Sequence, residues 1–246
     1  MIAYFVAAFA IVKNLSSESS AATRAGSRGL LNMVRHFSIL EVTMNQRRTS
    51  NSPLLDPSFC TVVLISPDAL DQGPADPSTP ATCKRATEII AKAAEIAGVP
   101  VFVLSARHLE QQFSSSPALS SMRGHVRFDF EQHTSPWSHQ AFVEALSAQD
   151  RTILILAGLW LEHEILATAL NALVDGYDVY VLLDASAPRS PLASTAARER
   201  LSQGGGTPIT TSQVINEWAF ETTDASMRAA LMALLPVLLD VKPPGA

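Results

Sequence analysis

The sequence predicts a three-layer α/β domain, in which helices cover both faces of an open, mostly parallel sheet. The run Ile153–Gly158 is too short for a helix and too uniformly apolar for a strand with one polar face. Asp178–Leu183 (DVYVLL) indicates a second buried strand. Between them, apolar residues recur at helical spacing over Glu162–Val174, and Gly176 follows where a C-terminal cap belongs. A strand, a crossover helix and another parallel strand form a right-handed βαβ unit.

The same alternation begins near residue 58. Cys60–Ile65 (CTVVLI) predicts a buried first strand. A helix is predicted over Thr82–Ala97, because its alanines and isoleucines recur on one face and Gly98 can end it. Val101–Leu104 predicts the next short strand. Ligands of such sheets bind beyond the carboxyl ends of the strands, so we expect the site there.

The remaining elements are less regular. Ser105–His139 is a long polar segment, which we interpret as a loop of the kind that forms lids or flexible excursions. A helical turn at Phe142–Leu146 leads into the central βαβ unit. After that unit the pattern predicts a helix near Ala193–Ser202, a strand edge at Pro208–Thr211 and a helix at Asp224–Leu239.

The N-terminal residues do not share this pattern, so we expect an extension at 1–53 and one domain at 54–246. The apolar run Ile2–Val12 is shorter than the ~20 residues that span a bilayer, and we expect no membrane partner. The Arg- and Ser-containing stretch after it loosely resembles an organelle transit peptide. The interpretation we favour is a disordered or non-native extension, with Met44 as an alternative start.

Composition limits the function classes. With 246 residues and 47% hydrophobic content, the chain is long enough for one buried core. The net charge is -5, and an acidic body without a basic stripe argues against nucleic acid as a partner. Cys60 and Cys83 lack CxxC spacing and lie apart from any histidine pair. They indicate a reducing, cytoplasmic location and neither a disulfide nor a zinc site, and we expect no cofactor.

The segment GLWLEHEILATALNALVDGYDVYVLLDAS resembles the hallmark of the isochorismatase-like cysteine hydrolase superfamily, which includes nicotinamidases, N-carbamoylsarcosine amidohydrolases and isochorismatases. VVLISPD resembles the first strand of that superfamily, and AAEIAGVPVFVLS resembles its helix and second strand. SPWSHQAFVEAL and GGGTPITTSQVINEW resemble stretches of one uncharacterised branch. The resemblance covers residues 57–218 and implies a Rossmann-like, three-layer fold. Relatives form dimers and larger rings, so it also implies a homo-oligomer.

The resemblance implies three catalytic positions, and all three differ from the family pattern here. The family's cysteine nucleophile, placed where a helix N-terminus lowers its thiol pKa, falls on Glu164. The aspartate base at the end of the first strand falls on Ser66. The lysine falls near Gln132, or near Phe130 if the long loop is aligned differently. We therefore expect nucleophile, base and cation all to be missing.

Other residues offer substitutes. Glu164 is a possible carboxylate nucleophile, although an anion at a helix N-terminus is also an ordinary stabilising feature. Asp68 is a possible acid, shifted two residues from Ser66. His133 and His139 give only a weak metal signal, because no carboxylate stands at ligand spacing. A triad of Ser66, His133 and Asp68 can be written, but no GxSxG motif supports it.

The remaining candidates concern binding. Leu159 and Trp160 fall where the family has a non-proline cis peptide. Trp160, Trp137 and Phe142 would give a pocket an aromatic lining suited to a small planar ligand. The alternative is that these aromatic residues belong to the core. His163 is expected on the helix surface rather than in a catalytic role.

Two hypotheses follow. In the first, the chain is a catalytically degraded member of the superfamily that binds a small molecule or acts as a scaffold. In the second, it hydrolyses a small amide, ester or vinyl ether with Glu164, Asp68 and a histidine of the long loop. The second hypothesis requires these side chains to converge within hydrogen-bond reach.

Overall fold

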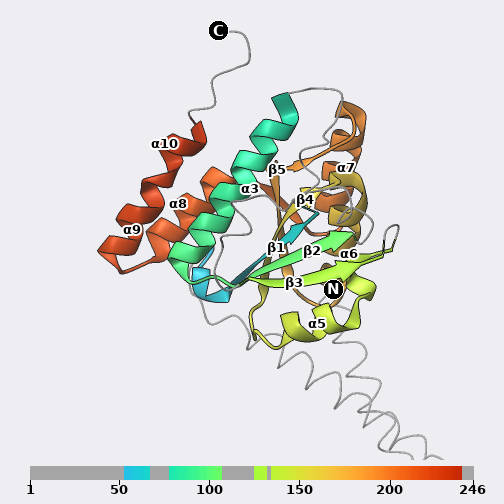
Figure 1. Cartoon of the computed structure of the whole chain (residues 1–246), viewed down its shortest axis with the longest axis horizontal. Helices are drawn as coiled ribbons and strands as arrows, with labels where there is room; N and C mark the ends of the chain where they lie inside the picture. Colours follow the sequence, from blue (N-terminus) through green and yellow to red (C-terminus); the bar gives the residue numbers. More distant parts are fainter. Residues whose placement is uncertain (1–52, 67–77, 107–124, 132–133, 240–246) are drawn as a thin grey trace, which may run out of the picture. The chain divides into compact units, whose positions relative to one another are not determined.

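A computed structural model describes residues 53–66, 78–106, 125–131 and 134–239 (Figure 1). All of them belong to one compact unit, Ser50–Ala246. The extension expected at 1–53 lies outside the described residues, apart from Pro53. Within these ranges, no helix has both the length and the apolar character needed to cross a membrane.

Six strands form one sheet in the order β3-β2-β1-β4-β5-β6, and every neighbouring pair is parallel. The predicted α/β class and the central βαβ unit are therefore confirmed. The strands are β1 Cys60–Ile65, β2 Val101–Ala106, β3 Val126–Phe130, β4 Ile153–Leu159, β5 Asp178–Ala187 and β6 Thr207–Ile209.

Helices cover both faces of the sheet, which gives three layers (Figure 1). One layer contains α3 Ser78–Ala97, α8 Thr211–Glu221, α9 Ala225–Met232 and α10 Leu234–Leu239. The other contains α5 Gln140–Ser147, the π-helical turn η4 Leu161–Ile165, α6 Leu166–Val174 and α7 Pro191–Gln203. Two 3-10 turns, η1 Pro57–Phe59 and η3 Pro136–Ser138, complete the described elements.

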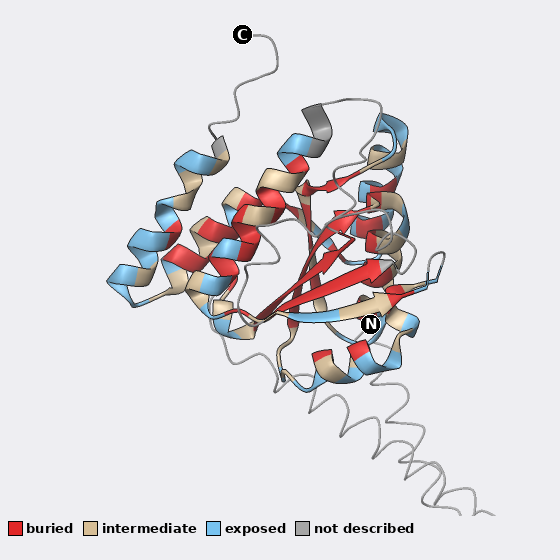
Figure 2. Cartoon of the chain, viewed as in Figure 1, coloured by how far each residue is buried: buried red, intermediate tan, exposed pale blue. Residues whose placement is uncertain are grey.

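The alternation of side chains along β1 builds the two cores. Val62 and Leu64 pack with α3 and α8, whereas Val63 and Ile65 pack with α5 and α6. All six residues of β1 are buried, and Figure 2 shows the central strands as the buried middle layer. This burial on both faces explains why the strand has no polar side.

One strand and one helix were not predicted from the sequence. β3 lies inside the segment that we interpreted as a loop, although its alternating sequence VRFDF has the period of a strand. Helix α8 was also missed, and it shortens the strand expected at Pro208–Thr211. That strand ends at Ile209 because Thr210 forms a capping box with Gln213 at the start of α8.

The long helix expected at Asp224–Leu239 is instead two shorter helices. Asp224 is the N-cap of α9, and its carboxylate accepts hydrogen bonds from the backbone of Ser226 and Met227. α9 ends at Met232, and α10 starts at Leu234 after the C-cap Ala233. The prediction of one continuous helix was therefore wrong in this detail.

The carboxyl ends of β1, β2 and β4 lie side by side. Ile65 is paired with Leu104 of β2 and with Gly158 of β4. Gly158 has a φ of 127°, and a Cβ atom built there would collide with the carbonyl oxygen of Ile65. The expected proximity of the strand ends at Ser66 and Gly158 is thus confirmed, and it defines the edge where a ligand can bind.

Candidate functional site

The candidate site begins where β4 passes into η4. The peptide bond between Leu159 and Trp160 is cis, at the place that the family resemblance indicated. Trp160 is the N-cap residue of η4, and its backbone N–H donates a hydrogen bond of 3.1 Å to Oε2 of Glu164. The Glu164 carboxylate is therefore bound to the start of its own helix.

Further contacts hold Glu164 in place. The carbonyl oxygen of Trp160 accepts hydrogen bonds from the N–H groups of His163 and Ile165, at 3.1 and 3.3 Å. The Thr168 hydroxyl donates to the Glu164 carbonyl oxygen at 2.7 Å. An anion at a helix N-terminus is stabilised by the helix dipole. This arrangement fits a structural role for the carboxylate.

Ser66 lies directly beyond β1. It is 6% exposed, it has a φ of 46°, and its N–H donates to the carbonyl oxygen of Leu104 at 2.7 Å. The chain therefore offers a buried hydroxyl just beyond the end of β1. Three other predicted site residues, Asp68, Gln132 and His133, lie outside the described residues.

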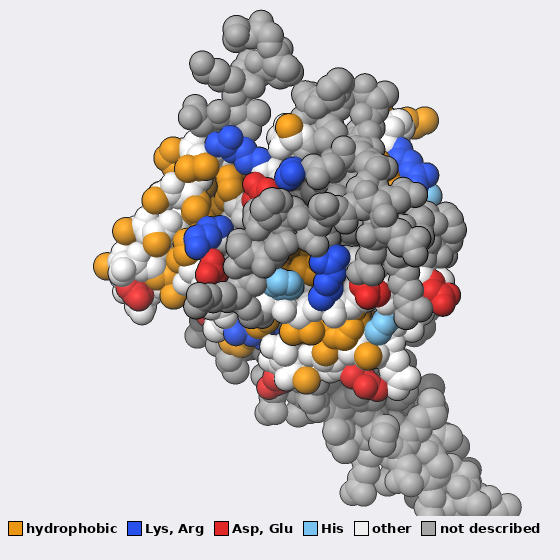
Figure 3. Space-filling view, in the orientation of Figure 1, with side chains coloured by type: hydrophobic (Ala, Val, Ile, Leu, Met, Phe, Trp, Pro, Cys, Tyr) orange, Lys and Arg blue, Asp and Glu red, His pale blue; other side chains and the backbone are white. Residues whose placement is uncertain are grey.

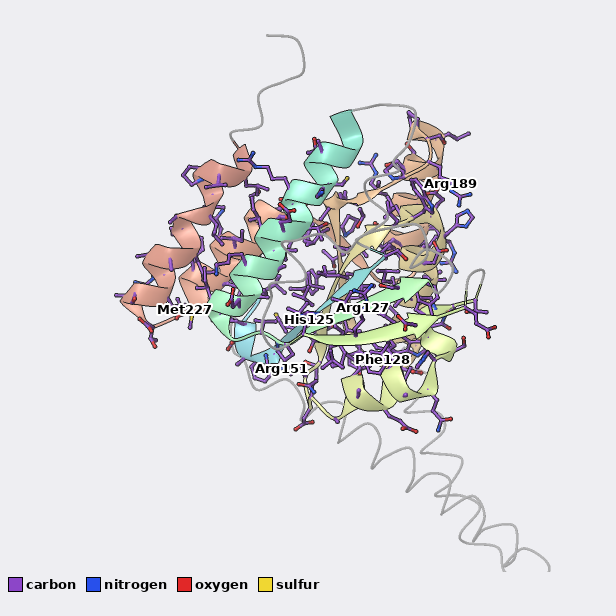
Figure 4. All side chains as sticks on the ribbon, in the orientation of Figure 1. His125, Arg127, Phe128, Arg151, Arg189 and Met227 are labelled. Atoms are coloured by element: carbon purple, nitrogen blue, oxygen red, sulfur yellow. The ribbon has the colours of Figure 1, made fainter. Side chains whose placement is uncertain are left out.

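Trp160 lies between an apolar cluster and a cation. Its ring packs against the buried residues Cys83, Leu159 and Ala187. The guanidinium carbon of Arg189, which is labelled in Figure 4, lies 5.2 Å from the centre of the Trp160 ring. The backbone N–H of Arg189 donates to Glu162 at 3.1 Å, which connects the end of β5 to η4. Trp160 is thus a partly exposed aromatic surface at the carboxyl edge of the sheet.

Trp137 is not part of this edge. Its Nε1 donates to Oδ2 of Asp175 at 2.8 Å, and its ring contacts those of Phe142 and Tyr177. Asp175 is the C-cap of α6, the far end of the helical run that starts after Trp160. At 1.5 Å per residue, the two ends are about 20 Å apart. The structure therefore does not bring Trp137 and Trp160 into one pocket.

The histidines near this region have different surroundings. His139 is the N-cap of α5, and its Nδ1 accepts a hydrogen bond of 3.3 Å from the N–H of Phe142. Its ring also contacts Phe128. His163 is exposed on η4, as expected from the sequence. Among the described residues, no group of three or more His, Cys, Asp or Glu side chains could hold a metal ion.

Both cysteines are free and buried. Burial and, to a smaller extent, the nearby Asp184 carboxylate together raise the pKa of the Cys83 thiol to about 12. Burial likewise raises the pKa of the Cys60 thiol to about 12. Because the thiolate is the nucleophilic form, neither thiol is reactive at neutral pH.

Sequence reasoning missed a polar row at the ends of β2 and β3. Ser105 is 5% exposed, and its Oγ accepts a hydrogen bond of 2.9 Å from Nη2 of Arg127. Ser105 is paired with Asp129 across the two strands. Oδ1 of Asp129 is buried and has no hydrogen-bond partner in the described part of the chain. The alternation of polar and aromatic residues in VRFDF was the signal that could have revealed it.

The parallel sheet, the helix that starts beyond β4 and the cis peptide between them define a three-layer α/β protein. Residues 63–213 match the model of the isochorismatase domain. This chain therefore belongs to the isochorismatase family.

Comparison with known proteins finds relatives of similar fold. The chain is 36% identical over 74 residues to the probable hydrolase YcaC of Escherichia coli K12; the match spans 30% of this chain and 36% of YcaC. The crystal structure of Escherichia coli YcaC, an octameric hydrolase of unknown specificity, superimposes with a TM-score of 0.67 and 23% identity, over 78% of this chain and 95% of that one.

A second solved structure is similar to this chain. YcaC from Pseudomonas aeruginosa, with hexane-2,5-diol and covalent acrylamide, has a TM-score of 0.64 and 21% identity, over 78% of this chain and 96% of that one. At these identities the structural likeness establishes the fold alone.

Proposed function

We propose that this member of the isochorismatase family binds a small molecule without performing the cysteine-dependent hydrolysis of its relatives. The observation that carries this proposal is the hydrogen bond between Oε2 of Glu164 and the backbone N–H of Trp160. A carboxylate held in this way, at a helix N-terminus that stabilises its charge, is a poor nucleophile.

Two further features support the proposal. Ser66 supplies a hydroxyl in place of the strand-end carboxylate, and a hydroxyl is not a general base at neutral pH. The two thiols are buried, with pKa values of about 12. Loss of several groups that act as a unit is harder to compensate than loss of one.

Trp160 is the surface that we propose for ligand contact. Its ring is partly exposed at the carboxyl edge of the sheet, beside the Arg189 guanidinium. An aromatic face next to a few polar groups suits a small planar molecule. Trp137 provides a matched control, because its indole is bound to Asp175 at the other end of the helix.

The proposal is tested by hydrolysis and binding assays on the full chain. Release of product from propionamide, p-nitrophenyl acetate and ethyl vinyl ether should not exceed the rate without protein. Benzamide binding, followed by NMR, should be lost in Trp160→Ala and retained in Trp137→Phe. Hydrolysis that disappears in Glu164→Gln would instead establish the carboxylate as a working nucleophile.

We also propose that the chain forms a homo-oligomer in the cytoplasm. Apolar side chains gather over α9 and α10 in Figure 3, and Phe220, Met232 and Val237 are exposed there or on the adjoining α8. The octameric state of Escherichia coli YcaC supports assembly, and the free cysteines support a reducing compartment. A single monomeric species in sedimentation at micromolar concentration would contradict the oligomer.

A further inference from the structure

The helices α9 and α10 carry apolar side chains on two opposite faces. On the inner face Leu231 is buried, and Met227, Leu234, Leu235 and Leu238 pack against the core cluster of the α3 layer. Figure 1 shows the two helices beyond α8 and α3, at the margin of this layer. The inner face therefore already supplies the burial that holds both helices on the domain.

The outer face of these helices, formed by the exposed residues of 225–237, is apolar as well. It consists of alanines, Met232, Pro236 and Val237, and its only polar residues are Ser226 and Arg228. Figure 3 shows apolar side chains gathered over α9 and α10. Helices that are apolar all round are normally buried all round, so the outer face is of the kind that another molecule covers.

Large exposed apolar side chains are concentrated on these adjoining helices. Six such residues are exposed in the ranges that the structure describes, and three of them lie on α8, α9 and α10: Phe220 at 67%, Met232 at 41% and Val237 at 48%. The other three lie singly on β3, α6 and α7. Single apolar residues on a surface are ordinary, whereas a group on neighbouring helices indicates an interaction surface.

The charges of the outer face favour a second copy of the same chain. Two copies carry the same net charge of -5 and repel each other where their charges meet. In a two-fold contact, a residue near the axis meets its own copy, so a charge there is unfavourable. From 225 to 239 the only charged residue is Arg228. Its Nε and Nη2 donate to the carbonyl oxygens of Ala219 and Thr222, at 3.0 and 2.5 Å, which directs the guanidinium to the end of α8.

A lipid surface suits the same face less well. Helices that lie on membranes carry Lys and Arg along the border of the apolar face, where these residues attract anionic lipids. Here the one such residue, Arg228, is already bound to the backbone of α8. The net charge of the chain is also negative, so anionic headgroups would repel it.

We propose that two copies of this chain pack against each other through the outer faces of α9 and α10, about a two-fold axis. The inference rests on the homo-oligomer of the proposed function and assigns the surface that forms it. Ala225, Ala229 and Ala233 recur at the spacing of one helix side, and Ala229 is the middle one. The two copies of Ala229 therefore lie nearest the axis, and the partner covers Met232 and Val237.

The first test places like charges at the centre of this contact. Ala229→Arg sets two guanidinium groups against each other, so the dissociation constant of the pair should rise by about a hundredfold or more. Ala196→Arg is the matched control: Ala196 is an exposed alanine of α7, in the other helical layer, so its replacement should leave the dissociation constant unchanged. Sedimentation velocity over a dilution series measures both. Because arginine is a good helix former, both variants should keep the circular dichroism of the wild type.

A cross-link tests the two-fold geometry independently. With copper phenanthroline as the oxidant, Ala229→Cys should form a disulfide-linked dimer, visible on a non-reducing gel. Ser202→Cys, exposed in the last turn of α7, should stay monomeric on the same gel. The native Cys60 and Cys83 are buried, so they should not contribute a cross-link.

The outcomes distinguish this inference from the proposed function. If the wild type is an oligomer and either Ala229 variant does not behave as expected, the contact uses another surface and this inference alone is overturned. A monomeric wild-type chain overturns the proposed homo-oligomer as well. Flotation of the chain with vesicles of phosphatidylcholine and phosphatidylserine, lost in Ala229→Arg, would assign the outer face to lipid and also overturn the inference. None of these results affects the hydrolysis and benzamide assays.

Discussion

The Glu164 carboxylate accepts a hydrogen bond from the backbone N–H of Trp160, four residues earlier, at 3.1 Å. This contact closes the first turn of the helix that follows β4. The carboxylate lies beyond the carboxyl end of β4, in the turn η4. Substitutions of Glu164 should therefore change both the stability of this helix start and the reactivity of this edge of the sheet.

Removing the carboxylate should weaken the start of the helix. Glu164→Ala leaves the Trp160 N–H without its acceptor and should lower the free energy of unfolding by about 1 kcal/mol. Glu164→Gln keeps an acceptor oxygen, so its free energy of unfolding should fall by less. Urea unfolding followed by circular dichroism measures both. Equal stability of Glu164→Ala and the wild type would show that the contact is not made in solution.

Replacing Glu164 with cysteine should create a reactive thiol. At the helix N-terminus the pKa of that thiol should fall, so Glu164→Cys should alkylate with iodoacetamide at pH 7 faster than Cys60 or Cys83. Ser202→Cys, exposed in the last turn of α7 and far from a helix N-terminus, is the control and should react at an ordinary rate. Mass spectrometry of the peptides identifies each site.

Amide hydrolysis should remain absent in Glu164→Cys. Ser66 cannot take the proton, and position 132 carries glutamine, so Ser66→Asp and Gln132→Lys should both be needed before turnover appears. Turnover in the single variant would mean that another residue already serves as the base.

Gly158 should not tolerate a side chain. Its φ of 127° and the carbonyl oxygen of Ile65 both exclude a Cβ, so Gly158→Ala should cost roughly 3 kcal/mol or more. Gly98 has a φ of 65° and open space for 4 Å around the position a Cβ would take, so Gly98→Ala should cost only about 1 kcal/mol. Denaturant midpoints of the two variants compare them directly. Equal losses of unfolding free energy in the two variants would indicate that β1 and β4 can move apart at Gly158 to accommodate a Cβ.

Alkaline pH should destabilise the fold through the buried thiols. The pKa of Cys83 is raised in the folded protein from about 9 to about 12, so the folded state holds its proton longer than the unfolded state does. The stabilisation is complete below pH 9 and is lost as pH rises towards 12. Cys83→Ala should therefore lose less stability than the wild type between these values. Urea midpoints of both proteins, measured from pH 9 to pH 12, test whether stability falls as pH rises.

The sequence predicted the central strands because β1 and β4 are apolar on both faces, a pattern that depends only on local composition. β3 is an edge strand with Arg127 and Asp129 on its open face, so its polarity concealed it within a polar segment. The proximity of Ser66 to Gly158 followed from parallel pairing alone. The position of Trp137 could not be predicted in this way, because its contact with Asp175 joins residues 38 apart in the sequence.

The order of the strands has a consequence for how the chain is made. β1 lies between β2 and β4 (Figure 1), and Arg151, just before β4, donates to the Cys60 carbonyl oxygen across 91 residues. During synthesis β1 can pair with β2 early, but its other edge must wait until β4 has left the ribosome. Such distant pairing slows folding and exposes an unpaired strand meanwhile. A nascent chain that is halted before residue 150 should therefore depend on chaperones, and the ligand edge should form only after β4 joins.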